Sequence, residues 1–471
     1  MKNKRLLVRI LCLIMCLVLF VSLVACVDNG EGDDTGNNNG NNNTGDLPDD
    51  NTGNGGDNTG TGDNTGNSGN SGNNTGSGNS GNTGDDTPKG PVAKDWVNVT
   101  TYNDDEALDA YLQPIWHTRE VYDETVVIVG NDGEATLLYE PNGQKLVVRN
   151  YELKKTYVEG VDYVIEGRTI KRLKTGSLPY FKTDDYFMKT FPNTPGYYKI
   201  FLNPAECEFQ FDEQRYIVFG EGATLTKGHY ITVSYTTDED WDGAVPIDQS
   251  ARTARFLKKV KSGQASIMFY GDSITVGANA SGSDAGGNIN PYLPIYPELI
   301  KNFLEKKYNA KINLMNEAVG AWKAVNGADN FNERVRSKAA DIDLLVLAFG
   351  MNDTTTDPAL FKSQMAQMVS SYLDANPNGL VVLVSPMLPN RQSTLVQQQV
   401  HFEKKLWEIA ESDGAVVVAE VTSMFESFEK TGKRSRDWFA NNCKHPNDFG
   451  VRIYAQVILK TLLGDEFIKE T

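Results

Sequence analysis

Histidine and cysteine are scarce in this chain of 471 residues, which contains four histidines and five cysteines. The histidines form no His-Glu-x-x-His pattern and no cysteines cluster beside them, so a catalytic zinc site is not predicted. Cys207 and Cys443 lie far apart, one in each predicted folded region. Two such cysteines are not a disulfide framework, and we expect two free thiols or one isolated bridge. The sequence therefore predicts neither a metal nor another cofactor.

Basic residues are also fewer than acidic residues. The chain has 45 Lys and Arg residues against 62 Asp and Glu residues, which gives a formal net charge of −17. Binding to nucleic acid depends on basic side chains that neutralise phosphates. The composition therefore excludes nucleic acid as an expected partner, and it argues against charge-driven docking on anionic lipid.

Apolar residues are nearly absent from residues 27–93, which contain mostly Gly, Asn, Thr, Asp and Ser in recurring Asn-Thr-Gly and Asn-Ser-Gly units. Such a segment has nothing to bury and is predicted to be a flexible tether. The tether follows a basic stretch (Lys2 to Arg9) and an apolar run over 10–24 that ends in Leu-Val-Ala-Cys at Cys26. This pattern is typical of a signal peptide.

The Leu-Val-Ala-Cys ending looks like a bacterial lipobox, which implies cleavage before Cys26 and lipidation of its sulfur. We therefore predict a lipoprotein signal peptide over 1–25 and a lipidated Cys26 with its tether over 26–93. The mature protein would then be extracytoplasmic and anchored to the cell membrane by lipid. The alternative is an ordinary secretory signal in which Cys26 is incidental.

Short strand-like runs dominate residues 94–245. They lie at 125–129, 145–149, 197–202, 216–219 and 230–235, and turn-forming residues such as Pro141-Asn142-Gly143 separate them. Regular short strands with such turns predict an antiparallel β-sandwich or jelly roll as an accessory domain.

Strands and helices alternate over residues 262–466. Strands are predicted at 266–270, 312–316, 342–349, 380–385 and 415–421, and helices at 296–308, 357–373, 394–411 and 447–463. Five buried strands in this succession predict an α/β fold in which helices cover both faces of a parallel sheet. Active sites of such sheets lie at the carboxyl ends of the strands.

Four short motifs fall at those strand ends or after them. They are Gly271-Asp272-Ser273, Asn316-Glu317-Ala318-Val319-Gly320, Gly350-Met351-Asn352-Asp353 and His445-Pro446-Asn447. A serine on a tight strand-to-helix turn presents an exposed hydroxyl next to backbone N–H donors, as a nucleophile requires. In their order and spacing the four motifs resemble the SGNH (GDSL-type) hydrolase superfamily. The resemblance implies a three-layer, flavodoxin-like fold around a five-stranded parallel sheet, and an esterase activity.

The resemblance also implies roles for individual residues. Ser273 would be the nucleophile and His445 the general base. The oxyanion hole would consist of the Ser273 N–H, a glycine N–H of the second motif and the Asn352 side chain. The second motif departs from the family pattern, because its usual glycine falls on Ala321 while Gly320 lies one residue earlier.

The third member of the expected triad is missing. The family usually has Asp-x-x-His, and the acid position is Asn442 in this chain. Asn442, a main-chain carbonyl or Asp437 could orient the histidine, although an amide cannot stabilise an imidazolium as a carboxylate does. Some SGNH esterases with an N-terminal β-sandwich similarly lack this acid and work as Ser-His dyads.

The substrate is predicted from the same resemblance. SGNH relatives cleave acetyl esters on polysaccharides, and others cleave lysophospholipids or thioesters. A lipid-anchored enzyme with a tether and a β-sandwich is most similar to the carbohydrate O-deacetylases. The polar loop at 277–288 favours a hydroxyl-rich ligand, so we expect an acetylated polysaccharide or cell-wall glycan. The alternatives are a lysophospholipase or short-chain lipid esterase, and an inactive carbohydrate-binding surface lipoprotein.

Overall fold

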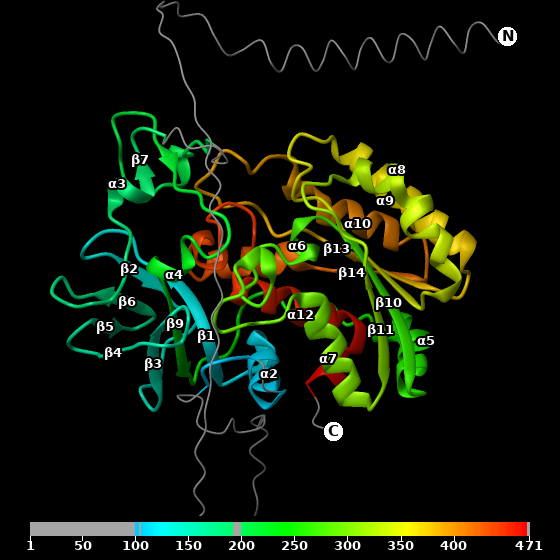
Figure 1. Ribbon diagram of the computed structural model, residues 1–471, viewed down its shortest axis with the longest axis horizontal. Coiled ribbons are helices and arrows are strands. Elements are labelled where there is room, and N and C mark those ends of the chain that lie inside the picture. Colours follow the sequence, from blue (N-terminus) through cyan, green and yellow to red (C-terminus); the bar gives the residue numbers. More distant parts are fainter. Residues whose placement is uncertain (1–98, 103–104, 192–198, 469–471) are drawn as a thin grey trace, which may run out of the picture. The chain divides into compact units, whose positions relative to one another are not determined.

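The computed structural model describes residues 99–102, 105–191 and 199–468 (Figure 1). The predicted signal peptide, Cys26 and the tether over 26–93 lie outside these residues, as does the beginning of the strand predicted at 197–202. Within the described ranges, no helix combines the length and the apolar character needed to cross a bilayer.

The C-terminal region is built on five parallel strands, as predicted. Their spatial order is β11-β10-β12-β13-β14. The first strand of the region therefore lies inside the sheet, and the carboxyl ends of β10 and β12 are neighbours at the point where the strand order reverses, which is where such folds place their sites. The strands are β10 (Gln264–Gly271), β11 (Lys311–Asn316), β12 (Leu344–Ala348), β13 (Leu380–Val384) and β14 (Val416–Ala419).

Successive side chains of these strands enter two different hydrophobic cores, because side chains alternate between the faces of a sheet. In β12, Leu344 and Val346 pack in one core, and Leu345 and Leu347 pack in the other. Helices α5 (Ser250–Lys261), α7 (Tyr296–Tyr308) and α12 (Asp448–Leu463) contribute to the first core, whereas α8 (Ala324–Arg334), α9 (Pro358–Ala375) and α10 (Phe402–Ala410) contribute to the second. Helix α5 precedes residue 262, so this layered unit begins earlier than the boundary predicted from the sequence.

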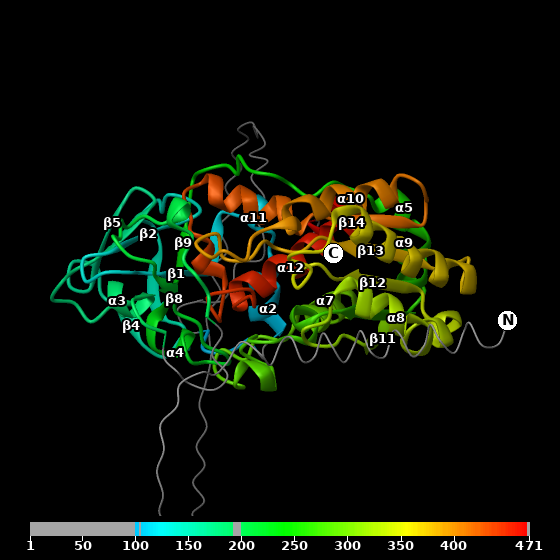
Figure 2. The same cartoon turned by 90° about the horizontal axis from the view of Figure 1, so that it is seen from above.

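The N-terminal region contains antiparallel strands, as predicted, and lies at the opposite end of the view in Figure 2 from the parallel sheet. One sheet has the order β1-β9-β3-β4, a second β2-β6-β5, and β7 pairs with β8. The strands are β1 (Glu120–Val127), β2 (Glu134–Thr136), β3 (Leu146–Asn150), β4 (Thr156–Tyr157), β5 (Tyr163–Glu166), β6 (Thr169–Arg172), β7 (Phe187–Met188), β8 (Tyr216–Ile217) and β9 (Tyr230–Thr236). The remaining helices are α2 (Asp105–Leu112), α3 (Thr183–Tyr186), α4 (Thr226–His229), α6 (Ser273–Val276) and α11 (Val421–Lys430).

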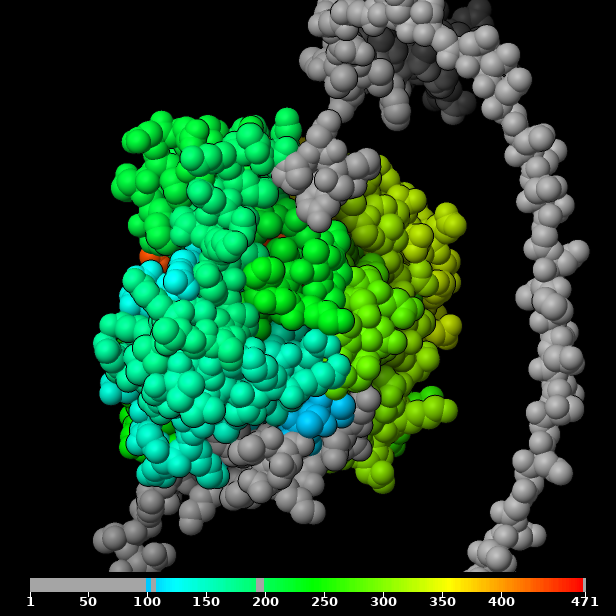
Figure 3. Space-filling view, turned by 60° about the vertical axis from the view of Figure 1, so that its left-hand side comes forward, coloured from blue at the N-terminus to red at the C-terminus, as the bar shows by residue number. Residues whose placement is uncertain are grey.

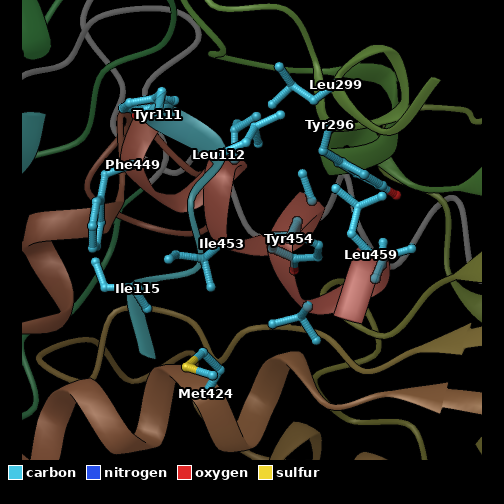
Figure 4. Packing of buried hydrophobic residues seen from close by; sticks show 14 of the residues in the cluster. Tyr111, Leu112, Ile115, Tyr296, Leu299, Met424, Phe449, Ile453, Tyr454 and Leu459 are labelled. Atoms are coloured by element: carbon cyan, nitrogen blue, oxygen red, sulfur yellow. The ribbon is translucent and has the colours of Figure 1, made fainter. Parts of the chain in front are cut away.

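The two regions share one hydrophobic core. Figure 4 shows Phe449 and Ile453 of α12 beside Tyr111 and Ile115 from the start of the N-terminal region, and all four belong to one buried cluster. Arg452 lies between the regions as well, and its guanidinium donates to the Tyr122 carbonyl at 2.7 Å. In the space-filling view the cyan-to-green surface of the N-terminal region meets the green-to-yellow surface of residues beyond 270 (Figure 3). The described residues of the two regions therefore lie in one compact unit.

Buried ion pairs also join the two regions. The Lys433 ammonium lies 2.7 Å from a Glu124 carboxylate oxygen, and neither side chain is exposed to solvent. Lys433 also donates to the Thr125 carbonyl at 2.8 Å. Arg436, which is almost fully buried, pairs with Glu208. Separating the two regions would leave these charges unpaired, which is costly for a buried charge. The pairs therefore tie the N-terminal region to the segment that leads to His445.

Candidate active site

Ser273 lies on the tight turn that joins β10 to α6. The Asp272 side chain caps this short helix by accepting the Ile274 N–H at 3.0 Å. Gly271 allows the turn to pass close to β12, since a Cβ atom there would lie 2.5 Å from the Ala348 carbonyl oxygen. The turn thus places the Ser273 hydroxyl at the carboxyl end of the sheet, with 7% of the residue exposed.

His445 meets Ser273 from the loop that precedes α12. Its Nε2 atom lies 2.9 Å from Ser273 Oγ, which is hydrogen-bond distance. The Asn441 side-chain oxygen accepts backbone N–H groups from Cys443, Lys444 and His445, at 3.1, 3.0 and 2.9 Å. One buried asparagine therefore fixes the loop that carries the imidazole.

The other ring nitrogen faces two side chains that the sequence analysis did not select. His445 Nδ1 lies 2.6 Å from Asn279 Oδ1 and 3.2 Å from Glu221 Oε2. Both oxygens accept when Nδ1 carries the proton, which leaves Nε2 free to accept the Ser273 hydroxyl. Asn279 belongs to the polar loop at 277–288, whereas Glu221 comes from the N-terminal region, between β8 and α4.

Asn442 and Asp437, the two side chains proposed to orient His445, hydrogen-bond elsewhere. The Asn442 side chain accepts from Tyr186 at 2.9 Å and donates to the Val218 carbonyl at 3.0 Å. Asp437 accepts the Val127 N–H at 2.8 Å. The Asn442 backbone is left-handed, with φ of 59°. The structure therefore gives the position beside Nδ1 to Asn279 and Glu221 instead.

The opposite side of the site holds the candidate oxyanion donors. Asn352 accepts from the Lys444 ammonium at 2.7 Å, and one of its amide hydrogens goes to the Trp322 carbonyl at 3.0 Å. A second amide hydrogen is left for a ligand. Gly320 lies next to Ser273, because a Cβ atom built on it would be 4.0 Å from Ser273 Cβ.

Ala321 adopts φ of 63°, in the left-handed region that favours glycine. This is the position where counting along the second motif placed the usual glycine. Within the described part of the chain, the N–H groups of Gly320 and Ala321 donate no hydrogen bond. Either could therefore donate to a ligand beside Ser273.

Burial and charge act differently on the acids around the site. Burial raises the pKa of Asp272 to about 7. Burial also tends to raise the pKa of Glu221, but contacts with His445, Asn441 and Asn279 outweigh it, so the pKa of Glu221 is lowered. Glu221 is therefore a carboxylate at neutral pH.

The described residues contain no group of three His, Cys, Asp or Glu side chains that could hold a metal. Cys207 is half-buried, Cys443 is buried, and both are free thiols. Burial raises the pKa of Cys443 to about 12, so it stays protonated although it lies near His445 in the chain. The side chains that converge on Ser273 are thus suited to proton transfer and to stabilising a developing anion.

Only part of this arrangement has a signal in the sequence. Asn279 and Asn441 lie within a few residues of Ser273 and His445 in the chain, so their closeness to the motifs is a signal. Glu221 has no such signal, because nothing in its local sequence indicates that its loop reaches the histidine.

Residues 269–453 match the family model described as GDSL-like Lipase/Acylhydrolase. No curated protein matches the chain in sequence. Among solved structures, a two-domain esterase active on acetylated mannans is 21% identical; the match covers 47% of this chain and 54% of that chain, with a TM-score of 0.37. The chain thus spans about half the length of that esterase. Axe2, an acetylxylan esterase from Geobacillus stearothermophilus, is 19% identical over 45% of this chain and 100% of its own, with a TM-score of 0.36.

Proposed function

Since the chain belongs to the GDSL-like lipase/acylhydrolase family through residues 269–453, it is a carboxylic ester hydrolase, and we propose that it removes O-acetyl groups from polysaccharide outside the cell by a Ser-His mechanism. The observation that carries the mechanism is the 2.9 Å contact between Ser273 Oγ and His445 Nε2 at the end of β10.

In this mechanism Ser273 Oγ attacks the acetyl carbonyl carbon while His445 Nε2 takes the hydroxyl proton. The tetrahedral intermediate bears an oxyanion, which accepts from the Ser273 N–H, the N–H of Gly320 or Ala321, and the Asn352 amide. Its collapse breaks the ester bond, and the sugar alkoxide leaves with the proton from His445. Water, activated by His445, then attacks the acetyl-serine and releases acetate.

The preference for a short acyl group is supported by what surrounds the serine. Two charged side chains lie at the site: Glu221 contacts His445, and Lys444 contacts Asn352. A long acyl chain would have to displace water from these charged groups, which costs free energy without gaining apolar contacts. Sugar hydroxyls can instead hydrogen-bond to them.

The proposed location outside the cell depends on Cys26 and the tether over 26–93. A lipid on Cys26 would hold the enzyme at the membrane while the tether lets it reach glycan chains. Replacing Cys26 by Ser should release the protein from the membrane fraction into the medium or soluble fraction. Unchanged membrane association of the variant would contradict the anchor.

The activity is tested with Ser273→Ala and His445→Ala, and with the exposed residues Ser370→Ala and His401→Ala as matched controls. We expect the first two variants to lose at least about 10³-fold in kcat on p-nitrophenyl acetate, because the two groups act as one unit. The controls should keep full activity.

The substrate preference is tested with the wild type, which should favour acetate over octanoate esters and release acetate from acetylated xylan or mannan. Higher kcat/KM on octanoate would indicate the lysophospholipase or lipid-esterase alternative, and an inactive wild type the binding-protein alternative.

A further inference from the structure

The loop between β8 and α4 enters the candidate active site from the N-terminal region. It contains Glu221, whose Oε2 atom lies 3.2 Å from His445 Nδ1. Three asparagines that follow Ser273 in the chain hold this loop. Asn442 donates to the Val218 carbonyl at 3.0 Å, Asn441 to Glu221 Oε1 at 3.3 Å, and Asn279 to the Gly222 carbonyl at 3.0 Å.

These contacts bind the loop at three points. A loop fixed in this way holds its carboxylate in one place, although half of the Glu221 side chain is exposed. Two of the three asparagines, Asn279 and Asn442, have left-handed backbones with φ of 68° and 59°. Asn is one of the few residues that tolerate this conformation. The residue type at these two positions therefore suits the backbone that holds the loop.

We propose that Glu221 is a positioning residue that acts through His445, so that the N-terminal β region supplies the carboxylate of a composite triad. This inference rests on the proposed Ser-His mechanism. It makes the N-terminal region a part of the catalytic machinery, in contrast to an accessory domain that only binds substrate.

The two oxygens that face His445 Nδ1 have different tasks. Asn279 Oδ1, at 2.6 Å, is the closer acceptor and fixes the tautomer in which Nδ1 carries the proton. It is neutral and contributes little when the ring becomes an imidazolium. Glu221 contributes the negative charge that stabilises the imidazolium formed while Ser273 attacks. Solvent screening at a half-exposed carboxylate makes this a moderate effect.

The other charged groups near His445 explain why a carboxylate beside the ring would stabilise the imidazolium. Lys444 precedes the histidine and is held at Asn352, and its positive charge opposes a second cation on the ring. Asp272 precedes Ser273, and burial raises its pKa to about 7, so part of the population is neutral at neutral pH. Within the described part of the chain, Glu221 is the only acid whose carboxylate contacts the His445 ring.

The test uses the full chain and compares Glu221→Gln with Glu159→Gln, an exposed glutamate of the same region. With p-nitrophenyl acetate, Glu221→Gln should lower kcat about 10- to 100-fold and change KM by less than about twofold, because the interaction strengthens only in the transition state. The acidic limb of the kcat/KM profile should move to lower pH, since loss of the carboxylate disfavours the imidazolium. Glu159→Gln should change neither quantity.

A rescue variant separates positioning from folding. Asn279→Asp, made in the Glu221→Gln background, returns a carboxylate to Nδ1 at the closer position. It should recover a large part of the lost kcat and move the acidic limb back to higher pH. Asn279→Ala combined with Glu221→Ala leaves neither of the two side-chain oxygens at Nδ1 and should lose more than the product of the two single losses.

The outcomes distinguish this inference from the proposed function. If Ser273→Ala and His445→Ala are inactive but Glu221→Gln keeps the wild-type kcat and pH profile, only the role of Glu221 is overturned. Glu221→Gln could instead lower both kcat and the unfolding midpoint, with no recovery by Asn279→Asp. In that case Glu221 merely supports the fold, and the inference is again overturned. Full activity of Ser273→Ala would instead overturn the proposed function itself.

Discussion

The parallel-sheet region and the antiparallel β region hold their active-site side chains in different ways. In the parallel-sheet region, Ser273 and Asn352 lie on the short segments that follow β10 (Gln264–Gly271) and β12 (Leu344–Ala348), and these two strands pair with each other in the sheet. In the β region, Glu221 lies on a loop that follows the two-residue strand β8, and side chains of the other region fix that loop. The first region is organised by its backbone, and the second by contacts across the boundary.

This difference shows which parts of the candidate site depend on the two regions remaining together. Ser273 and Asn352 would keep their positions as long as β10 and β12 stay paired. Glu221 would not, because its loop is held by Asn441, which donates to its carboxylate, and by Asn279, which donates to the Gly222 carbonyl. An exposed loop of one region is thus made rigid by the buried amides of the other.

Deleting the β region gives the largest expected effect. A chain that starts at residue 246 would expose Phe449, Ile453 and Arg452 of α12, which pack against Tyr111 and Ile115. We expect this fragment to lack a cooperative unfolding transition and to have no measurable esterase activity. Circular dichroism and p-nitrophenyl acetate hydrolysis check both. A folded and active fragment would show that the two regions are independent domains.

The buried ion pair between the regions gives the next largest effect. Lys433→Met would leave Glu124 buried without its cation, since both side chains are fully buried in the native structure. Removing one member of such a pair typically costs about 3–5 kcal/mol, which denaturant unfolding would measure. Lys430→Met, on the exposed end of α11, is the matched control and should cost less than about 0.5 kcal/mol. An equal and small cost for both variants would show that the pair does not join the regions.

The oxyanion side of the site depends on the parallel-sheet region alone. Asn352→Ala should lower kcat by about 10² to 10³ with little change in KM, because the amide acts on charge that develops only in the transition state. Lys444→Met keeps the amide but removes the ammonium that contacts its oxygen, and should cost less. If Lys444→Met were the more damaging variant, the ammonium and not the amide would be the main donor.

The sequence predicted the backbone-organised half of the site better than the half organised by contacts. Fully buried strands appear as continuous apolar runs, so β10 to β14 were placed to within a few residues, and three of the four motifs lie at or just after the ends of β10, β11 and β12. The fourth, with His445, lies instead on the loop before α12. Helix 394–411 was predicted too long: in the structure α10 begins at Phe402, after a short 3-10 turn at 398–401. Propensity alone does not determine where a helix begins, because packing and capping decide it.

Glu221 could not have been predicted in the same way. Its local sequence is a surface turn, and its role arises from contacts with residues far along the chain. Counting back from His445 placed the usual acid of the family at Asn442, whose side chain does not contact the His445 ring. The left-handed backbone at Asn442 and its bond to Val218 then direct the side chain into the boundary between the regions. The spacing of residues along the chain does not predict the direction of the Asn442 side chain.

A change in pH should affect the parallel-sheet turn through Asp272. Its pKa is raised by burial to about 7, above the value of an unfolded chain. The resulting stability is present below about pH 4 and is lost as pH rises through about 7. Asp272→Asn keeps a side-chain oxygen for the Ile274 N–H and removes the titration. Relative to this variant, the wild type should lose on the order of 2–4 kcal/mol of unfolding free energy between pH 5 and pH 8. Parallel pH dependences of the two proteins, measured by urea unfolding, would contradict the buried acid.

The smallest expected effect concerns the one residue of the second motif whose backbone conflicts with its side chain. Ala321 has φ of 63°, and a non-glycine residue in that region costs about 1–2 kcal/mol. Ala321→Gly removes the conflict but gives the unfolded chain more freedom, so the net gain in unfolding free energy should be only about 0.5–1 kcal/mol. Because the N–H of residue 321 keeps its direction, kcat should stay within about twofold of the wild type. Gly320→Ala is the matched comparison: it adds a Cβ atom 4.0 Å from that of Ser273, where a substrate would approach. We expect it to raise KM and leave stability unchanged. If Ala321→Gly destabilised the protein, the left-handed backbone would be maintained by contacts of the methyl group, and the alanine would be part of the packing of this site.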